Sequence, residues 1–303
     1  MLLESHKDTV AFSNLFKQDY PELFQELQTI LQNNGCAVLT LSGTRDYWCR
    51  DFMPIQYGDG KYVQYCYMPD YLQGQRQYQT NADNVVSKLD LQMDVSKPPL
   101  VVDGGNFVFC HGTSMNYVVM TNKVGFENQR YGWHEIEDMI GRHHPYDCVR
   151  IVWLPWVQSD MCGHSDGILR YVGITKDGKP IVLTNLTLYE ETHAQAMRVI
   201  LKEHFKVIEL KLSHYDELSW AYINCLQTKS VIIVPGIGDE LTDKEALRQI
   251  EELYPDYKGR VFQVQMRDFI AKGGGALNCC TWTICTCDVP KPDFYPDYSE
   301  CDA

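Results

Sequence analysis

Apolar residues recur every three or four positions in five stretches of the chain, and this spacing predicts five helices. The first begins near Pro21 and stops at Gly35, because proline suits a first helical turn and glycine a helix end. The other four are expected over about 83–93, 133–143, 190–205 and 243–253, the last after an N-cap at Thr242.

A run of β-branched and apolar residues follows each helix and indicates a buried strand. These runs cover 36–41, 100–102, 149–154, 206–210 and 260–264. Shorter strands joined by turns are expected over 107–110 and 117–121, over 169–174 and 180–183, and over 231–234. The order of helix, strand, segment of unusual residues and hairpin therefore repeats along the chain.

The expected helices begin at about 21, 83, 133, 190 and 243, at intervals of 62, 50, 57 and 53 residues. A near-regular period of this size indicates repeated units, arranged radially or in an array. Strict alternation of strands and helices around one open sheet is the structural alternative. Because no linker-like segment divides the chain, we expect one domain over 1–303, with an extended tail over 288–303.

Composition narrows the class of protein. The chain has 45% hydrophobic and 22% charged residues, which is typical of globular proteins, and a net charge of -13. Nucleic acid is disfavoured as a partner, whereas cationic small molecules are weakly favoured.

The sequence has no signal-peptide pattern and no apolar run long enough for a bilayer. The twelve scattered cysteines predict reduced, cytoplasmic thiols, and their spacing predicts no metal site.

Residues that could carry chemistry fall at the same phase of the repeat, just after the strand that follows each helix. The five segments contain Trp48 and Asp51; Asp103 and Asn106; His164 and Asp166; Trp220 and Asn224; and the run from Gly273 through Gly274, Gly275 and Asn278 to Cys279. If the units surround a common axis, these segments converge on it. Considered alone, each of these residues also has a purely structural explanation, such as an ion pair for Asp51 or a tight turn for Asp103.

The combined inventory is a thiol, an imidazole and several carboxylates. A cysteine beside a histidine indicates nucleophilic catalysis, because the thiolate is the attacking species. Two or more aspartates around that thiol would hold a cation, and a planar guanidinium donates in forks that carboxylates accept. His164 and Asp166 are two positions apart, so in an extended segment both point to one face.

Five motifs in order carry a resemblance to a known family. They are Trp48-x-Arg50-Asp51-x-x-Pro54, Asp103-Gly104-Gly105-Asn106, Gly163-His164-x-Asp166, Ala221-Tyr222-x-Asn224 and Gly273-Gly274-Gly275-x-Leu277-x-Cys279-x-Thr281. The set resembles the agmatine deiminase and bacterial peptidylarginine deiminase family of the guanidine-modifying enzyme superfamily. The resemblance implies an α/β fold, a five-bladed propeller (pentein) of ββαβ units with pseudo-fivefold symmetry.

The resemblance also implies a mechanism without metal or organic cofactor. Asp51 and Asp166 would bind the guanidinium, and Cys279 would attack its carbon. His164 would protonate the departing amine and then activate water, giving a ureido product and ammonia. Substrate-binding roles are expected for Trp48, Asp103, Asn106, Trp220, Asn224, Gly274, Gly275 and Asn278.

Three positions differ from the family pattern, namely Met53, Asn278 and Trp282, and we expect all three to reshape the pocket. Spacing from the glycines assigns the nucleophile to Cys279, with Cys280 directed into the core. The substrate stays open among agmatine, free arginine, peptidyl-arginine and related guanidines, and a homo-oligomer is compatible with the sequence. The alternatives are an amidinotransferase, in which an amine replaces water, and a non-catalytic module that binds cationic ligands.

Overall fold

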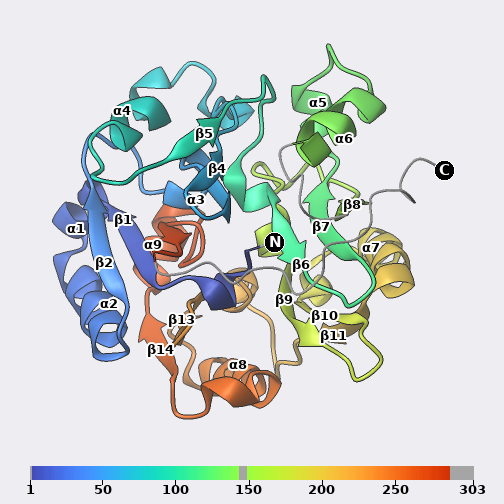
Figure 1. The fold of residues 1–303 in the computed structure, drawn as a ribbon. Coiled ribbons are helices and arrows are strands. Elements are labelled where there is room, and N and C mark those ends of the chain that lie inside the picture. Colours follow the sequence, from blue (N-terminus) through green and yellow to red (C-terminus); the bar gives the residue numbers. More distant parts are fainter. Residues whose placement is uncertain (1, 143–148, 287–303) are drawn as a thin grey trace.

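Five small sheets make up the strand content of the computed structural model, which describes residues 2–142 and 149–286. Each sheet has three strands, and helices connect the strands, so the fold is of the mixed α/β kind. Figure 1 shows the sheets spread around the middle of the molecule, where the N-terminal residues also lie. The expected tail over 288–303 falls outside the described residues.

The same strand pattern occurs in every sheet: a first strand pairs antiparallel with a central strand, which pairs parallel with a third. Four sheets come from continuous stretches of chain. Their strands are β3 (Ile55–Gly58), β4 (Lys61–Val63) and β5 (Asp94–Ser96); β6 (Val108–Cys110), β7 (Asn116–Thr121) and β8 (Val149–Leu154); β9 (Leu169–Ile174), β10 (Pro180–Thr184) and β11 (Lys206–Glu209); and β12 (Leu226–Gln227), β13 (Ile232–Gly236) and β14 (Val261–Gln265). In the fifth sheet, β15 (Thr281–Ile284) joins β1 (Thr9–Ser13) and β2 (Ala37–Leu41), so distant parts of the chain share one sheet.

Helices connect the central strand of each sheet to its parallel neighbour, as a parallel crossover requires. They are α1 (Asn14–Asp19) and α2 (Pro21–Asn33), α4 (Ala82–Val86), α5 (Lys123–Glu127) and α6 (Trp133–Arg142), α7 (Glu191–His204) and α8 (Glu240–Leu253). In α2, Phe24, Leu27 and Leu31 form the buried stripe that the sequence indicates. The five predicted helices are therefore present, although two of them have different bounds.

Two helix predictions need correction. The helix expected over 83–93 ends at Val86, and its strand is β5 over 94–96, not 100–102. Val101 makes an isolated bridge with Cys66, since Pro98 and Pro99 offer no N–H to extend a ladder. The cap of α8 is Asp239 rather than Thr242: its Oδ1 accepts the Thr242 N–H at 2.9 Å, so the helix begins three residues earlier.

The strands that follow the helices are less buried than predicted. They lie at the edge of each sheet, and in β2 only Leu41 is buried. The central strands carry the buried runs, and all five residues of β1 and of β13 are buried. The analysis of the sequence missed β1, β3, β4, β12 and β15, because two to five residues give little periodicity.

Five connections lead from the third strand of one sheet to the first strand of the next, and they contain the segments singled out by phase. They include α3 (Cys49–Phe52), the short 3₁₀ turns Gly104–Asn106, Ser165–Gly167 and Ser219–Tyr222, and α9 (Arg267–Gly273) with the loop that follows it. α3 packs against the turn at Gly104, and that turn packs against the one at Ser165. Within the described ranges, every helix is too short or too polar to cross a bilayer.

Candidate active site

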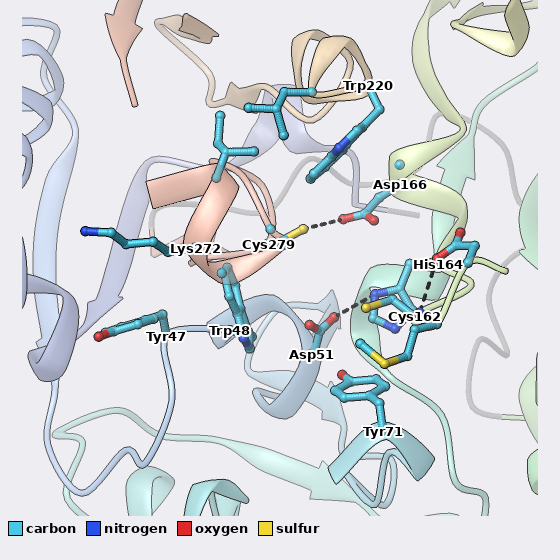
Figure 2. Close-up of a pocket in the computed structure, with 18 of the residues that line it drawn as sticks. Tyr47, Trp48, Asp51, Tyr71, Cys162, His164, Asp166, Trp220, Lys272 and Cys279 are labelled. Carbon is cyan, nitrogen blue, oxygen red and sulfur yellow. Dashed lines mark hydrogen bonds and ion pairs between the residues drawn. The ribbon is translucent and has the colours of Figure 1, made fainter. Parts of the chain in front are cut away.

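A cleft of about 1770 Å³ opens over these connections. Asp51, His164, Asp166 and Cys279 all line it, although they come from three different connections spread over most of the sequence. Figure 2 shows these four side chains facing one another, with Cys279 directed towards Asp166 and Asp51 towards His164. The structure therefore brings the four predicted catalytic residues into one cleft.

The position of Cys279 is fixed through its backbone. α9 ends at Gly273, and the next residue, Gly274, has a φ of +71°, which suits glycine and turns the chain out of the helix. The Cys279 N–H donates to Asn224 Oδ1 at 3.2 Å, and the Cys279 carbonyl accepts from the Arg50 N–H at 3.1 Å. Cys280 is fully buried in the core, so only the first cysteine of the pair reaches the cleft.

His164 lies between two carboxylates. Its Nε2 is 3.0 Å from Asp103 Oδ2, and its Nδ1 is 3.5 Å from Asp51 Oδ1. Asp51 Oδ1 also accepts the Gly105 N–H at 2.9 Å. A Cβ at residue 105 would lie 2.7 Å from Asp51 Oδ1 and 2.8 Å from His164 Nδ1, so glycine is required for this approach.

Asp166 is the carboxylate beside the thiol. Its Oδ2 lies 3.8 Å from the Sγ of Cys279 and accepts the Nδ2 of Asn278 at 2.7 Å. Its backbone carbonyl accepts Asn224 Nδ2 at 3.3 Å. Asn224 thus holds the backbones of both Cys279 and Asp166, while Asn278 orients the Asp166 carboxylate itself.

Burial and mutual repulsion shape the charges of the site. Burial together with Asp103 and Asp166 raises the pKa of Asp51 to about 8, despite the opposing effect of His164. Burial alone would lower the pKa of His164, but the neighbouring Asp51 and Asp103 outweigh it and raise the value to about 10. Burial, with Asp166 and Asp51 nearby, raises the pKa of the Cys279 thiol well above its ordinary value. These shifts favour a neutral Asp51 carboxyl, a cationic His164 and a protonated Cys279 thiol near neutral pH.

Aromatic side chains form the walls around the thiol. Trp48 and Trp220 line the cleft, and in Figure 2 their indoles lie on two sides of Cys279. A Cβ at Gly273 would come within 2.8 Å of the Trp48 ring, and one at Gly275 would come closer still. The glycines of this loop thus serve two ends: Gly274 turns the backbone, and its neighbours make room for Trp48.

Four residues expected to touch substrate lie behind the lining of the cleft instead. Asp103, Asn106, Asn224 and Asn278 are not among the described residues that line it. Asp103 contacts His164, and Asn106 Oδ1 accepts backbone N–H groups of Thr121 and Ser165. Their geometry is that of supports for the lining side chains.

Two of the three departures from the family pattern also lie away from the cleft, contrary to the expectation. Met53 and Trp282 are buried together in the core of the sheet formed by β15, β1 and β2. The Trp282 indole donates to the carbonyl of Pro54 at 2.7 Å. Only Asn278, through Asp166, touches the site.

The sequence analysis missed Tyr71, whose hydroxyl donates to Asp103 Oδ2 at 3.1 Å, and Cys162, which lines the cleft near His164 (Figure 2). It also missed Lys123, a lysine only 2% exposed. None of the three lies at the recurring phase, and the one available signal is the position of Cys162 immediately before the Gly163-His164 motif.

Comparison with known proteins places this geometry in context. Residues 14–284 match the family model of the Porphyromonas-type peptidyl-arginine deiminases. A search of curated protein sequences found no significant match.

Solved structures resemble the whole fold. Agmatine deiminase of C. jejuni is 18% identical, with a TM-score of 0.69, over 93% of this chain and 94% of its own. Agmatine deiminase of Enterococcus faecalis is 17% identical, with a TM-score of 0.63, over 91% and 93%. The N-terminal domain of a cyanobacterial arginine dihydrolase is 14% identical, with a TM-score of 0.58, over 91% and 97%. Because the family model matches most of the sequence, the chain belongs to the Porphyromonas-type peptidyl-arginine deiminase family.

Proposed function

We propose that the protein hydrolyses a guanidine group to a ureido group and ammonia, through a covalent intermediate on Cys279. The observation that carries the proposal is the cleft in which the Cys279 thiol and the His164 imidazole meet the buried carboxylates Asp51 and Asp166. These two carboxylates would repel a Cys279 thiolate unless a cation enters with it. A guanidinium supplies that charge, and its flat fork of N–H groups matches carboxylate oxygens.

In the proposed binding step, Asp51 and Asp166 accept the guanidinium N–H groups on either side of the attacked carbon. Asp51 must be ionised for this, and an entering cation lowers its raised pKa. The same cation lowers the pKa of the Cys279 thiol, so binding releases the proton of the nucleophile. The positive charge of the substrate thus promotes the ionisation of both Asp51 and Cys279.

In the first half-reaction, the Cys279 Sγ forms a bond to the guanidinium carbon, and one C–N bond breaks. His164, protonated because its pKa is about 10, gives a proton to the departing amine, which leaves as ammonia. In the second half, neutral His164 takes a proton from water as the water oxygen attacks the amidino-thioether. The C–S bond then breaks, and the ureido product leaves.

The fold offers a reason why these residues meet. We propose that the five sheets are the blades of a closed propeller with pseudo-fivefold symmetry, and that its axis passes through the cleft. Five sheets with one strand pattern support this, as does the pairing of β15 with β1, which joins distant parts of the chain. The connections between blades would then all point to the axis.

For the substrate, we propose agmatine or a related alkylguanidine or arginine derivative. Beyond Asp51 and Asp166, carboxylates outnumber lysines and arginines in the lining of the cleft, which contains Asp19, Asp46, Asp160, Glu190 and Glu217 but only Arg45 and Lys272. An ammonium group at the far end of the substrate would suit this lining better than a carboxylate would. Trp48 and Trp220 would flank the alkyl chain between the two charged ends.

The test measures ammonia and ureido product from agmatine, free arginine, methylated arginines and peptidyl-arginine. We expect turnover of at least one of them by the wild-type chain, its loss in Cys279→Ala, and its retention in the neighbouring control Cys280→Ser. Folded wild-type protein that turns over none of these compounds would refute the proposal. Product that forms only after an acceptor amine is added would indicate an amidinotransferase instead.

A further inference from the structure

Lys123 is a buried cation that the proposed reaction does not use. It begins α5 and is 2% exposed, yet its ammonium group has four oxygen neighbours. Nζ lies 2.8 Å from Asp70 Oδ1, 3.4 Å from Glu127 Oε1, 3.0 Å from the carbonyl of Met161 and 3.2 Å from that of Cys162. It also lies over the rings of Tyr71 and Trp156, at 5.2 and 5.7 Å from their centroids.

These contacts join two segments that form one side of the cleft. The first is the turn Asp70–Leu72, which carries Tyr71. The second is the loop 156–164, which leads through Cys162 to His164. The two segments are about ninety residues apart in sequence, and a single ammonium group bonds to a carboxylate in one and to carbonyls in the other.

The first segment reaches the candidate catalytic histidine through one shared oxygen. The Tyr71 hydroxyl donates to Asp103 Oδ2 at 3.1 Å, and His164 Nε2 lies 3.0 Å from that same oxygen. If Tyr71 moved away, Asp103 Oδ2 would lose its second donor. The other oxygen, Oδ1, has no hydrogen-bond partner in the described part of the chain, so Tyr71 and His164 alone orient this carboxylate.

The second segment reaches His164 directly along the backbone. Gly163, with a φ of +62°, bends the chain between Cys162 and His164. A Cβ at Gly163 would come within 2.9 Å of Lys123 Cδ and 2.7 Å of the Trp156 ring. The lysine stem is therefore packed against the residue that aims His164, while its head holds the two carbonyls just before it.

We propose that Lys123 is a positioning residue that fixes His164 and Asp103 by clamping the Tyr71 turn to the loop before His164. This inference rests on the proposed function, since it assigns a role in that reaction. Lysine suits the task because its three N–H donors match the Asp70 carboxylate and the two carbonyls, while Glu127 lies at ion-pair distance. Burying that head is tolerable because Asp70 and Glu127 balance its charge.

The experiment compares kcat and KM for Lys123→Met, Tyr71→Phe and the double variant. Methionine keeps most of the stem and removes the charge. We expect kcat to fall about tenfold or more in each single variant, with KM changed by less than roughly threefold. Because part of the effect of Lys123 runs through Tyr71 and Asp103, the loss in the double variant should be clearly smaller than the product of the two single losses.

Two further variants keep the test decisive. Lys97→Met is the matched control, because Lys97 forms an exposed ion pair with Asp83 away from the cleft, and it should leave kcat unchanged. Asp70→Asn weakens the clamp from its exposed side and is expected to lower kcat about threefold even if Lys123→Met fails to fold. Asp70→Asn with unchanged kcat, or losses that multiply in the double variant, would overturn the proposal.

A readout without turnover separates this inference from the proposed function. Hydrogen exchange should rise over residues 66–80 and 156–164 in Lys123→Met, or in Asp70→Asn, and not in Lys97→Met. Unchanged exchange in both segments would overturn the clamp. Wild-type protein without deiminase activity would instead refute the proposed function, and the exchange result would still decide whether the clamp exists.

Discussion

At the scale of single residues, His164 has a carboxylate at each ring nitrogen. An imidazole can donate from both nitrogens only when it is protonated, so Asp51 and Asp103 together hold His164 in its cationic form. That form suits a general acid that must deliver a proton to a departing amine. Burial, with Asp103 and Asp166 nearby, raises the pKa of Asp51 to about 8 although His164 opposes the shift, so Asp51 ionises only at alkaline pH.

The two raised pKa values predict an alkaline optimum for kcat/KM. Below about pH 8 Asp51 is protonated and cannot accept a guanidinium, so kcat/KM should rise with pH. Above about pH 10 His164 loses the proton that the departing amine needs, so kcat/KM should fall. Asp103 raises both pKa values, and Asp103→Asn should therefore move both limbs of the profile to lower pH.

A pH series of initial rates for the wild type and Asp103→Asn checks this. Asp103→Asn should also lower the maximum, because the amide orients His164 less firmly. If both limbs of the Asp103→Asn profile stayed at their wild-type pH values, Asp103 would not set the pKa values of Asp51 and His164.

At this scale the sequence predicted the four side chains that meet in the cleft and missed Tyr71 and Lys123. Asp51, His164, Asp166 and Cys279 share a phase of the repeat, so their meeting could be inferred without coordinates. Tyr71 and Lys123 lie outside that phase, and they act through hydrogen bonds formed only when distant segments pack together. Their residue types alone carry no signal of that role.

At the scale of elements, the loop after α9 is built around the indole of Trp48. A methyl group at Gly275 would collide with this ring, and the ring lines the cleft beside Cys279. The close approach explains why two glycines flank Gly274, the one with a positive φ. Trp48 in turn packs against Phe269 of α9, with ring centroids 5.6 Å apart, so the same indole contacts both the loop and its helix.

Gly275→Ala should therefore displace Trp48 towards the cleft and lower kcat/KM by about 10- to 100-fold, because small misplacements in a site are costly. The matched control is Gly141→Ala in α6, where a Cβ meets nothing within 4 Å. It should leave activity unchanged and stabilise the protein by roughly 0.5–1 kcal/mol. Equal activity of both variants would show that the position of Trp48 does not affect catalysis.

The sequence predicted long helices well and short strands poorly. α2 and α7 show several turns of apolar spacing, so their bounds differ from the prediction by a few residues at most. Strands such as β3 and β4 have only three or four residues, and their pairing partners decide their structure. Apolar runs such as 36–41 predict buried strands, yet these runs form the third strands at the edges of the sheets, and in β2 only Leu41 is buried.

At the scale of the whole molecule, the pairing of β15 with β1 joins residues about 270 positions apart. The Cys279 loop leads directly into β15, so this sheet anchors the proposed nucleophile as well as the ends of the fold. The period of about fifty to sixty residues predicted repeated units. The shared sheet could not be predicted, because non-local strand pairing leaves no local pattern in either partner.

A truncation tests the importance of this sheet. Ending the chain after Cys280 removes β15, including the buried Trp282 and Ile284, whereas ending it after Thr286 keeps the strand. Loss of two large buried side chains costs roughly 5 kcal/mol or more, out of a total stability of about 5–15 kcal/mol. We expect urea unfolding to show a cooperative transition for the longer chain only. Two chains of equal stability would mean that β15 is dispensable.

If Cys279 carries the substrate during the reaction, a covalent adduct on this residue should be detectable by mass spectrometry. Wild-type protein mixed with its guanidine substrate is quenched in acid, and the protein mass is compared with that of Cys279→Ser. We expect an adduct on the peptide that contains Cys279, heavier by the mass of the substrate less ammonia, and no adduct in Cys279→Ser. Turnover by Cys279→Ser at the wild-type rate, or an adduct on another cysteine such as Cys162, would contradict this role of Cys279.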